Sequence, residues 1–178
     1  LETAYLREVA RCAPLAERLA TAERFGPVRG SRHLAYLNRQ TSGEGWVMIG
    51  DARAFLDPIY SSGLYLALGS AELAAQCIDE ALKSGDVSAA QLGRFEGPLM
   101  KGVEVVRRLI HAFYDPAFSF MEFAKRFPEH RRALIDCLVG DVIKDMSAFT
   151  TALAQMTPPP PPLGSNLPPP SAPAPVNA

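Results

Sequence analysis

Residues 50–63 of this chain read GDARAFLDPIYSSG, and this stretch decides how the rest of the sequence is interpreted. The apolar run at residues 46–49 predicts a buried strand before it, and residues 64–82 have the composition of a long apolar helix after it. A strand end, a glycine turn, a proline loop and a helix start bring a carboxylate and free backbone N–H groups to one crevice. This layout predicts a ligand site.

Asp51 is the candidate polar contact of that site. It follows Gly50 at the predicted end of the strand, where open α/β sheets bind their ligands and where a carboxylate suits a sugar or ribityl hydroxyl. An aspartate that only hydrogen-bonds its own turn explains the residue equally well. From the spacing alone, both interpretations stay open.

The second half of the stretch has the composition of a loop that passes close to a ligand. Pro58 stiffens it, and Ser61, Ser62 and Gly63 supply small side chains and open N–H groups at the start of the next helix. The positive end of that helix suits negative charge, such as the charge that an isoalloxazine ring gains on reduction. The alternative is a loop whose small residues serve only packing.

Length, composition and charge narrow the class of protein. The 178 residues fit one domain with a sizeable core. A formal net charge of −1 and a pI near 6.4 do not indicate a nucleic acid or an anionic membrane as partner. The three cysteines are odd in number and widely spaced, so we expect no disulfide framework, no metal site and a cytoplasmic location. The apolar helix carries acidic residues and is a poor membrane span.

Periodicity and breakers predict the remaining elements. Upstream of the motif we expect helices at 2–12 and 14–23, then short strands at 24–29, 33–38 and 46–49. Downstream, Gly85 is expected to end the long helix and Ser88 to cap the next one. Further helices are predicted at 100–114, 118–123 and 129–155.

The predicted fold class is α+β and mainly α: the last strands of a larger sheet, a long buried helix, a helical C-terminal region and a proline-rich tail. We divide the chain into residues 1–86, 87–156 and 157–178. The last segment holds ten of the sixteen prolines and no charged residue, so we expect it to be disordered or polyproline-like. Its PPPPPL tract is a passive tail or a ligand for a proline-recognition domain.

The motif and its flanks resemble a known family. GDARAFLDPIYSSG, with WVMI before it and LYLALGSAELAA after it, resembles the second FAD-binding motif of flavin-dependent halogenases and related flavoprotein monooxygenases. In that family the motif reads approximately G-D-A-x-x-F-x-D-P-x-x-S-[ST]-G. The upstream GPVRGSRHLAYLNRQTSGEGW and the downstream RRLIHAFYDPAFSFMEF are also similar to the family, the latter to its phenolic and pyrrolic branch. The resemblance covers about residues 1–155.

The resemblance implies roles for individual residues. Asp51 would bind the ribityl chain of FAD, Pro58 would line the isoalloxazine ring, and the backbone of Ser61, Ser62 and Gly63 would contact the ring edge. Ser62 and Gly63 would also hold a halide. The implied cofactor-binding set is Gly50, Asp51, Pro58, Ser61, Ser62 and Gly63. Arg53 departs from the small residue usual at its position, and it either reaches the pyrophosphate or points to solvent.

Other family features have no counterpart in this sequence. The strand–GxGxxG–helix unit that grips the ADP half of FAD, the W-x-W-x-I-P motif and the catalytic lysine are all expected upstream of this chain. Leu1 begins directly in a helical pattern. We therefore expect a C-terminal portion of a larger enzyme, inactive and weak in FAD binding by itself.

The implied activity is that of an FAD-dependent oxidoreductase. In the full-length enzyme, reduced FAD and O2 would form a flavin hydroperoxide that oxidises halide or substrate. The implied partners are a small aromatic or pyrrolic substrate, halide, and a separate flavin reductase or NAD(P)H. An aromatic hydroxylase or a reductase of the same fold is the alternative within this class.

A non-enzymatic helical module with a binding tail is the alternative from another class. A strand, loop and helix start around an open concave face would favour the flavin site, and a closed helical bundle that buries the loop would contradict it. His111 and the aromatic residues at 113–123 are candidates for a substrate pocket, but packing between helices explains them as well. His33 and His130 are expected at the surface.

Overall fold

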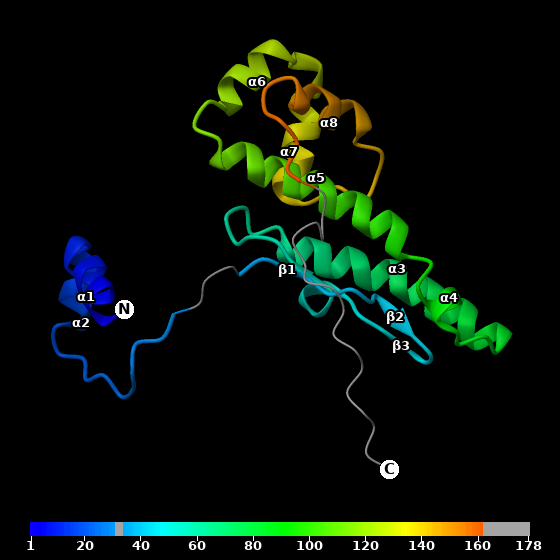
Figure 1. Cartoon of the computed structure of the whole chain (residues 1–178), viewed down its shortest axis with the longest axis horizontal. Helices are drawn as coiled ribbons and strands as arrows, with labels where there is room; N and C mark the ends of the chain where they lie inside the picture. Colours follow the sequence, from blue (N-terminus) through cyan, green and yellow to red (C-terminus); the bar gives the residue numbers. More distant parts are fainter. Residues whose placement is uncertain (31–33, 162–178) are drawn as a thin grey trace. The chain divides into compact units, whose positions relative to one another are not determined.

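The computed structural model describes residues 1–30 and 34–161. The chain divides into two units, Leu1–Leu34 and Ala35–Ala178, which are described here one at a time. Helices dominate the described residues and the strands are short (Figure 1), so the predicted mainly α fold class with a few strands is confirmed. His33, and the expected tail beyond residue 161, lie outside the described residues.

The first unit is a pair of helices, α1 (Glu2–Arg11) and α2 (Ala13–Leu19), with a proline in the first turn of α2 as expected. No residue of either helix is buried. The strand predicted at residues 24–29 is wrong, because this segment pairs with no other strand of the described chain. Pro27 removes a ladder donor from the middle of it, and an isolated strand has no stability of its own.

The second unit starts with two short antiparallel ladders. β2 (Ser42–Gly43) pairs with β3 (Trp46–Val47) across a turn in which Gly45 has φ of +76°. β1 (Tyr36–Leu37) pairs with β4 (Ala54–Phe55), which lies inside the motif where only a loop was expected. The buried strand predicted at 46–49 is wrong in both length and burial, since Trp46 and Ile49 are exposed.

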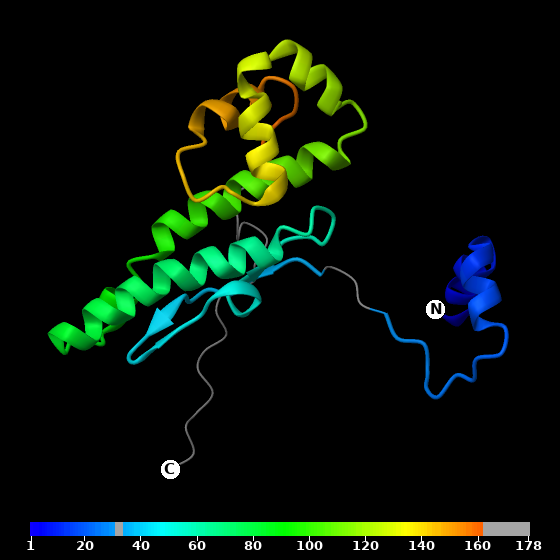
Figure 2. The same ribbon diagram turned by 180° about the vertical axis from the view of Figure 1, so that it is seen from behind.

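The long helix α3 (Gly63–Ser84) runs alongside the short strands and ends at Gly85, whose φ of +75° is the left-handed end that the glycine predicts (Figures 1 and 2). Its burial on most faces was expected and is wrong. Only one side is buried, through Ser70, Ala74, Cys77 and Ala81. Large side chains on the other side stay exposed because nothing in the described part of this unit covers them: Leu64, Leu68, Ile78 and Leu82.

Two further helices connect α3 to the C-terminal region. α4 (Ala89–Leu92) begins at Ser88, whose Oγ accepts the Gln91 N–H at 3.3 Å, so the predicted cap is confirmed. α5 (Glu96–Tyr114) is longer than the predicted helix at 100–114. A Cβ on Gly102 would lie 3.1 Å from the Val142 side chain, and this close approach explains a glycine inside the helix.

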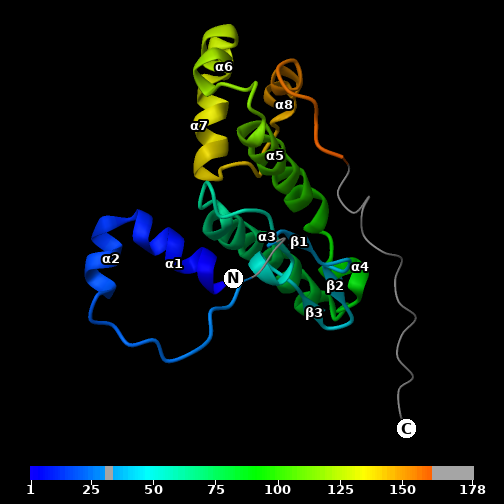
Figure 3. The same ribbon diagram turned by 60° about the vertical axis from the view of Figure 1, so that its left-hand side comes forward.

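The last helices are α6 (Phe120–Arg126), the 3-10 turn η2 (Pro128–His130), α7 (Arg131–Val139) and α8 (Ser147–Ala154). With α5 they form one group, which we call the helical group (Figure 3). The single helix predicted at 129–155 is wrong. Gly140, with φ of +88°, ends α7, and the Asp141 N–H turns back to the Asp136 carbonyl.

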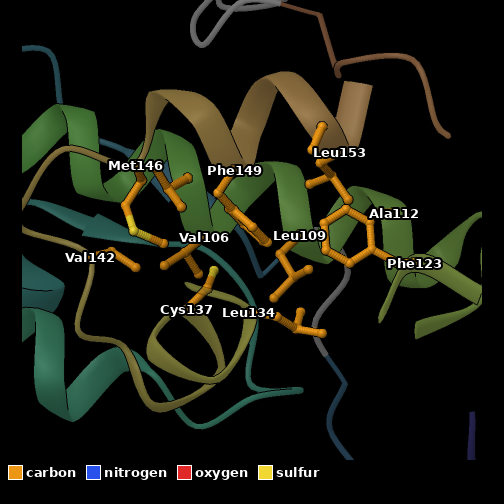
Figure 4. Packing of buried hydrophobic residues seen from close by; sticks show 12 residues of the cluster. Val106, Leu109, Ala112, Phe123, Leu134, Cys137, Val142, Met146, Phe149 and Leu153 are labelled. Atoms are coloured by element: carbon orange, nitrogen blue, oxygen red, sulfur yellow. The ribbon is translucent and has the colours of Figure 1, made fainter. Parts of the chain in front are cut away.

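The main core lies inside the helical group. Val106, Leu109 and Phe123 have no significant exposure, and the ring centroids of Phe123 and Phe149 lie 5.6 Å apart at a steep angle. Figure 4 shows these side chains of α5, α6 and α8 together with Leu134 and Cys137 of α7. A smaller cluster joins α3 to α5 through Ala74, Cys77, Phe95, Leu99 and Val103.

The end of the described chain packs on this group. Thr157 is buried, and its hydroxyl donates to Asp115 at 2.9 Å. Arg107 donates to the Pro161 carbonyl at 2.8 Å. The boundaries expected at residues 86/87 and 156/157 stay predictions. Across the described residues, every helix is too short or too polar to cross a membrane.

Candidate functional site

A cleft of about 660 Å³ lies between the motif, the start of α3 and the inner face of α5. Its volume is within the range usual for small-molecule and cofactor sites. The motif therefore forms a strand, loop and helix start around an open cleft, the arrangement that favours a ligand site over a closed bundle. The expected cofactor-binding residues all line it: Gly50, Asp51, Pro58, Ser61, Ser62 and Gly63.

Gly50 sets the sharp turn at the entrance of the motif. Its φ is +51°, and a Cβ there would lie 2.9 Å from the Ala67 Cβ, so a side chain is excluded by both conformation and space. The Gly50 N–H donates to the Ser70 Oγ at 3.0 Å, and this hydroxyl in turn donates to the Ala67 carbonyl. The start of the motif is thus fixed against the third turn of α3.

Asp51 lies in a 3-10 turn, η1 (Gly50–Ala52), with its side chain exposed. The turn is held from the side of β1: the Tyr36 hydroxyl donates to the Asp51 carbonyl oxygen at 2.6 Å, and the Asn38 side-chain amide donates to the Ala52 carbonyl oxygen. These contacts use the backbone of the turn and leave the Asp51 carboxylate available to a ligand.

The loop after β4 is tightly turned. The Asp57 carboxylate accepts the Ile59 N–H at 2.8 Å, and the Ser61 N–H donates to the Pro58 carbonyl at 3.1 Å. Ser61 adopts φ of +53°, a strained conformation for a residue with a side chain. Partial burial and the neighbouring Asp57 carboxylate raise the pKa of Tyr114, whose hydroxyl lies 3.3 Å from Asp57 Oδ2.

The N-terminus of α3 opens on the same cleft. Ser62 is buried at the N-cap but makes no side-chain cap hydrogen bond, and the first turn of α3 carries no acidic residue. The first N–H groups of α3 and the positive end of its helix dipole are therefore available to an anion or to the polar edge of a ligand. A Cβ on Gly63 would meet only the Asp51 Oδ1, at 3.9 Å. The carboxylate and the helix start thus lie beside each other, with open space next to Gly63.

Arg53 does neither of the two things considered for it. It is 4% exposed, so it does not point to solvent. Its two terminal nitrogens donate within the chain, one to the Asn38 carbonyl and the other to the Glu96 carboxylate at 2.7 Å. The guanidinium is therefore buried at the edge of the cleft and engaged with partners inside the protein.

The other candidates lie in or near the helical core. His111 is half-buried near the end of α5 and does not line the cleft. His130 is half-buried, not at the surface as expected. Phe118, Phe120 and Phe123 pack in contacting pairs with centroids 5.1–6.3 Å apart, which favours the packing interpretation. Burial raises the pKa of Tyr60, whose ring packs on Phe113 and Phe120.

Sequence reasoning missed residues that hold the motif from outside. Ser70 is the clearest, since it is a fully buried hydroxyl in an otherwise apolar stretch of α3, and that contrast could have identified it. Tyr36 and Asn38 lie in the predicted strand before the motif, but their neighbours depend on the pairing of β1 with β4. Leu99 and Val103 of α5 line the cleft from more than 35 positions away in the sequence.

Comparison with known proteins identifies the family. The sequence profile of the tryptophan halogenase family, described as "Tryptophan halogenase", matches residues 6–119, which include the whole motif. The chain belongs to this family. The match covers well over half of the chain, from within α1 to the residue before α6. The resemblance to flavin-dependent halogenases is therefore confirmed.

Individual halogenases are similar over the same region. A 1H-pyrrole-2-carbonyl-[peptidyl-carrier protein] chlorinase of Pseudomonas fluorescens is 33% identical over 128 residues, covering 72% of this chain and 28% of the relative. A tryptophan 2-halogenase of Chondromyces crocatus is 37% identical over 68 residues, 38% of this chain and 13% of the relative. A 1H-pyrrole-2-carbonyl-[peptidyl-carrier protein] brominase of Pseudoalteromonas luteoviolacea is 38% identical over 69 residues, which cover 39% of this chain and 17% of the relative. The chain thus spans less than a third of the length of these relatives.

Proposed function

We propose that the cleft along residues 50–63 is the isoalloxazine and ribityl half of an FAD site, and that the chain contributes it to an FAD-dependent halogenase. The observation that carries this proposal is the convergence of the Asp51 carboxylate and the open N-terminus of α3 on one cleft. Family membership supports the choice of FAD among the ligands that such a cleft could take.

The residues of the cleft fit the chemistry of a flavin. Asp51 would accept hydrogen bonds from ribityl hydroxyls. Pro58 and the open face beside Gly63 would lie along the flat ring, because no side chain obstructs that space. The uncapped N–H groups at the start of α3 would donate to the ring edge.

When bound, FAD supplies the redox chemistry, and the residues of this chain bind, orient and stabilise charge. The positive end of α3 favours negative charge beside Gly63, which lowers the free energy of an electron-rich ring placed there. The same helix start gives Ser62 and Gly63 the electrostatic environment of a halide site. Ser61, with its backbone in the left-handed conformation, directs the chain into the start of α3, where the ring edge and the halide would bind.

For the substrate we propose a small aromatic ring, with pyrrole as the leading class. A relative whose match covers 72% of this chain is named for a pyrrole carbonyl carried by a peptidyl-carrier protein. A separate reductase or NAD(P)H would supply the electrons. Because that relative acts on a carrier-bound pyrrole by its name, free and carrier-bound pyrroles are the two substrates to compare.

The first test measures FAD affinity directly. Titration of FAD into this chain, followed by quenching of flavin fluorescence, is expected to give weak but saturable binding. Asp51→Ala should weaken it at least tenfold, since hydrogen bonds to a charged group contribute about 1.5–3 kcal/mol. Asp79→Ala, an exposed carboxylate later on α3, is the matched control and should leave affinity unchanged. Equal affinity in both variants would contradict the role of Asp51.

The second test measures the chemistry in a protein extended upstream to the length of the relatives. Such a protein, supplied with FAD, a flavin reductase, NADH, O2 as the oxidant and chloride or bromide, should add halogen to a pyrrole substrate. Mass spectrometry would identify the halogenated product by its isotope pattern. An oxygen-containing product would indicate a hydroxylase instead. A flavin-loaded protein that modifies neither a pyrrole nor tryptophan would overturn the proposed substrate class.

A further inference from the structure

The most buried charged side chain of the described residues lies inside the motif and outside its expected ligand contacts. Arg53 is 4% exposed. One terminal nitrogen donates to the Asn38 carbonyl, and the other donates to Glu96 Oε1 at 2.7 Å. Its Nε is buried without a partner among the described residues, so the guanidinium depends on these two contacts.

Glu96 connects the motif to the helical group. It is the first residue of α5, and the same Oε1 also accepts the Thr41 hydroxyl at 2.6 Å. Thr41 is 2% exposed, and its carbonyl accepts the Met48 N–H at 2.7 Å, at the end of the β2–β3 hairpin. One carboxylate oxygen therefore joins the hairpin, the motif and the start of α5.

The contacts lead back to Asp51 through Asn38. The Asn38 N–H donates to the Arg53 carbonyl at 2.9 Å, while the Asn38 side chain donates to the Ala52 carbonyl. Arg53 in turn donates its N–H to the Gly50 carbonyl at 3.0 Å. The residues on both sides of Asp51 are thus fixed by a network whose anchor is the Arg53–Glu96 ion pair.

This ion pair also lies at the start of a helix that lines the cleft. Leu99 and Val103 line the cleft one and two turns after Glu96 on α5, on the wall opposite the motif. The pair therefore joins the start of α5 to the motif. Loss of the carboxylate would leave a buried cation without a charged partner, which proteins tolerate poorly.

We propose that Arg53 and Glu96 are positioning residues of the flavin site: their ion pair holds the Asp51 turn in its ligand-binding geometry and locks it to α5. Neither side chain needs to touch the cofactor. The part that concerns flavin rests on the proposed function above, whereas the hold on the Asp51 turn does not.

The first arm of the test needs no flavin. Glu96→Gln keeps the size and the acceptor oxygen but removes the charge, and Arg53→Lys keeps the charge but cannot span both acceptors. Amide hydrogen exchange at positions 38 and 53 should become about tenfold faster in both variants, because the backbone N–H groups there belong to the network. Glu104→Gln is the matched control: it removes a carboxylate paired to Arg107 and Arg108 on the same helix, away from the cleft. Unchanged exchange in Glu96→Gln would overturn the proposal.

The second arm measures FAD affinity under conditions where circular dichroism shows each variant fully folded. Glu96→Gln should bind FAD about tenfold more weakly than the unaltered chain, and Glu104→Gln should not. Saturating FAD should restore slow exchange in Glu96→Gln, since ligand and network stabilise the same turn. Faster exchange with unchanged affinity would overturn the link to flavin. If the unaltered chain binds no FAD even at millimolar concentration, the proposed function fails, and the exchange arm still decides whether the ion pair holds the Asp51 turn.

Discussion

The helical group and the α3 region are built from similar apolar residues but bury them to different degrees. In the helical group, Leu109 and Phe123 are 0% exposed and pack on neighbours from α6, α7 and α8. On α3, Leu64 and Leu82 are 71% exposed and Leu68 is 64% exposed. The helical group buries large side chains in its interior although it exposes others, such as Met121, whereas α3 buries mainly small ones, such as Ala74 and Ala81.

The difference shows which side of α3 the described residues leave uncovered. Leu64, Leu68, Ile78 and Leu82 recur at spacings of four, ten and four residues, which places them on one side of the helix. An apolar stripe of this kind indicates a surface that packs against more protein.

The largest effect should come from the closed core. Phe123→Ala in the helical group should lower the free energy of unfolding by about 3–5 kcal/mol, since it removes a fully buried ring and leaves a cavity. Leu68→Ala on the exposed side of α3 should change it by less than about 0.5 kcal/mol. Urea denaturation followed by circular dichroism measures both. A loss at Leu68 as large as that at Phe123 would show that the stripe is already covered.

Cysteine reactivity sharpens the same comparison. Cys77 lies on α3 and is 8% exposed, while Cys137 on α7 is fully buried, and burial raises the pKa of its thiol to about 12. A maleimide at neutral pH should therefore modify the exposed Cys12 first, then Cys77, and Cys137 only after the helical group opens. Peptide mass mapping over time gives the order. Modification of Cys137 before Cys77 would contradict the conclusion that the helical group is more tightly closed than the α3 region.

The smallest effect is the pH dependence of the helical group. Asp136 accepts a hydrogen bond from Lys144 at 2.8 Å, and this bond, with the Arg132 charge, lowers its pKa. A carboxyl with a lowered folded-state pKa stabilises above its unfolded pKa of about 3.9, and that contribution is lost as pH falls through the folded value. The urea concentration at the unfolding midpoint should therefore decrease as the pH is lowered below about 4.

Asp136→Asn should reduce that acid-dependent drop, because the variant has no proton to take up at this position. Asp79→Asn provides the control, since Asp79 is paired with Lys83 on the exposed side of α3. The same pH profile in Asp136→Asn and in the unaltered chain would show that other carboxyl groups cause the loss of stability at low pH.

Local signals predicted local structure well. Ser88 at the cap of α4 and Gly85 after α3 were identified from sequence because each acts on its own neighbours. The break at Gly140 was missed, since the apolar periodicity on both sides of it continues as in one helix. The motif located the candidate site, because a glycine-aspartate turn before a long helix is readable from sequence alone.

The support of that site could not be predicted in the same way. Arg53 and Glu96 are separated by 43 positions, and Gly50 and Ser70 by 20. Such contacts depend on how α3 and α5 pack, and no local pattern encodes that packing. The exposed side of α3 was likewise unpredictable, because an apolar sequence indicates what a helix needs to bury and not what covers it.

The central claim, that residues 50–63 form half of an FAD site, is tested most directly by mapping where FAD perturbs the chain. In a titration followed by backbone amide resonances, the largest shifts should fall on Gly50, Asp51 and residues 61–65, with smaller ones at Leu99 and Val103 of the opposite wall. Shifts confined to the helical group, or none at saturating FAD, would contradict it.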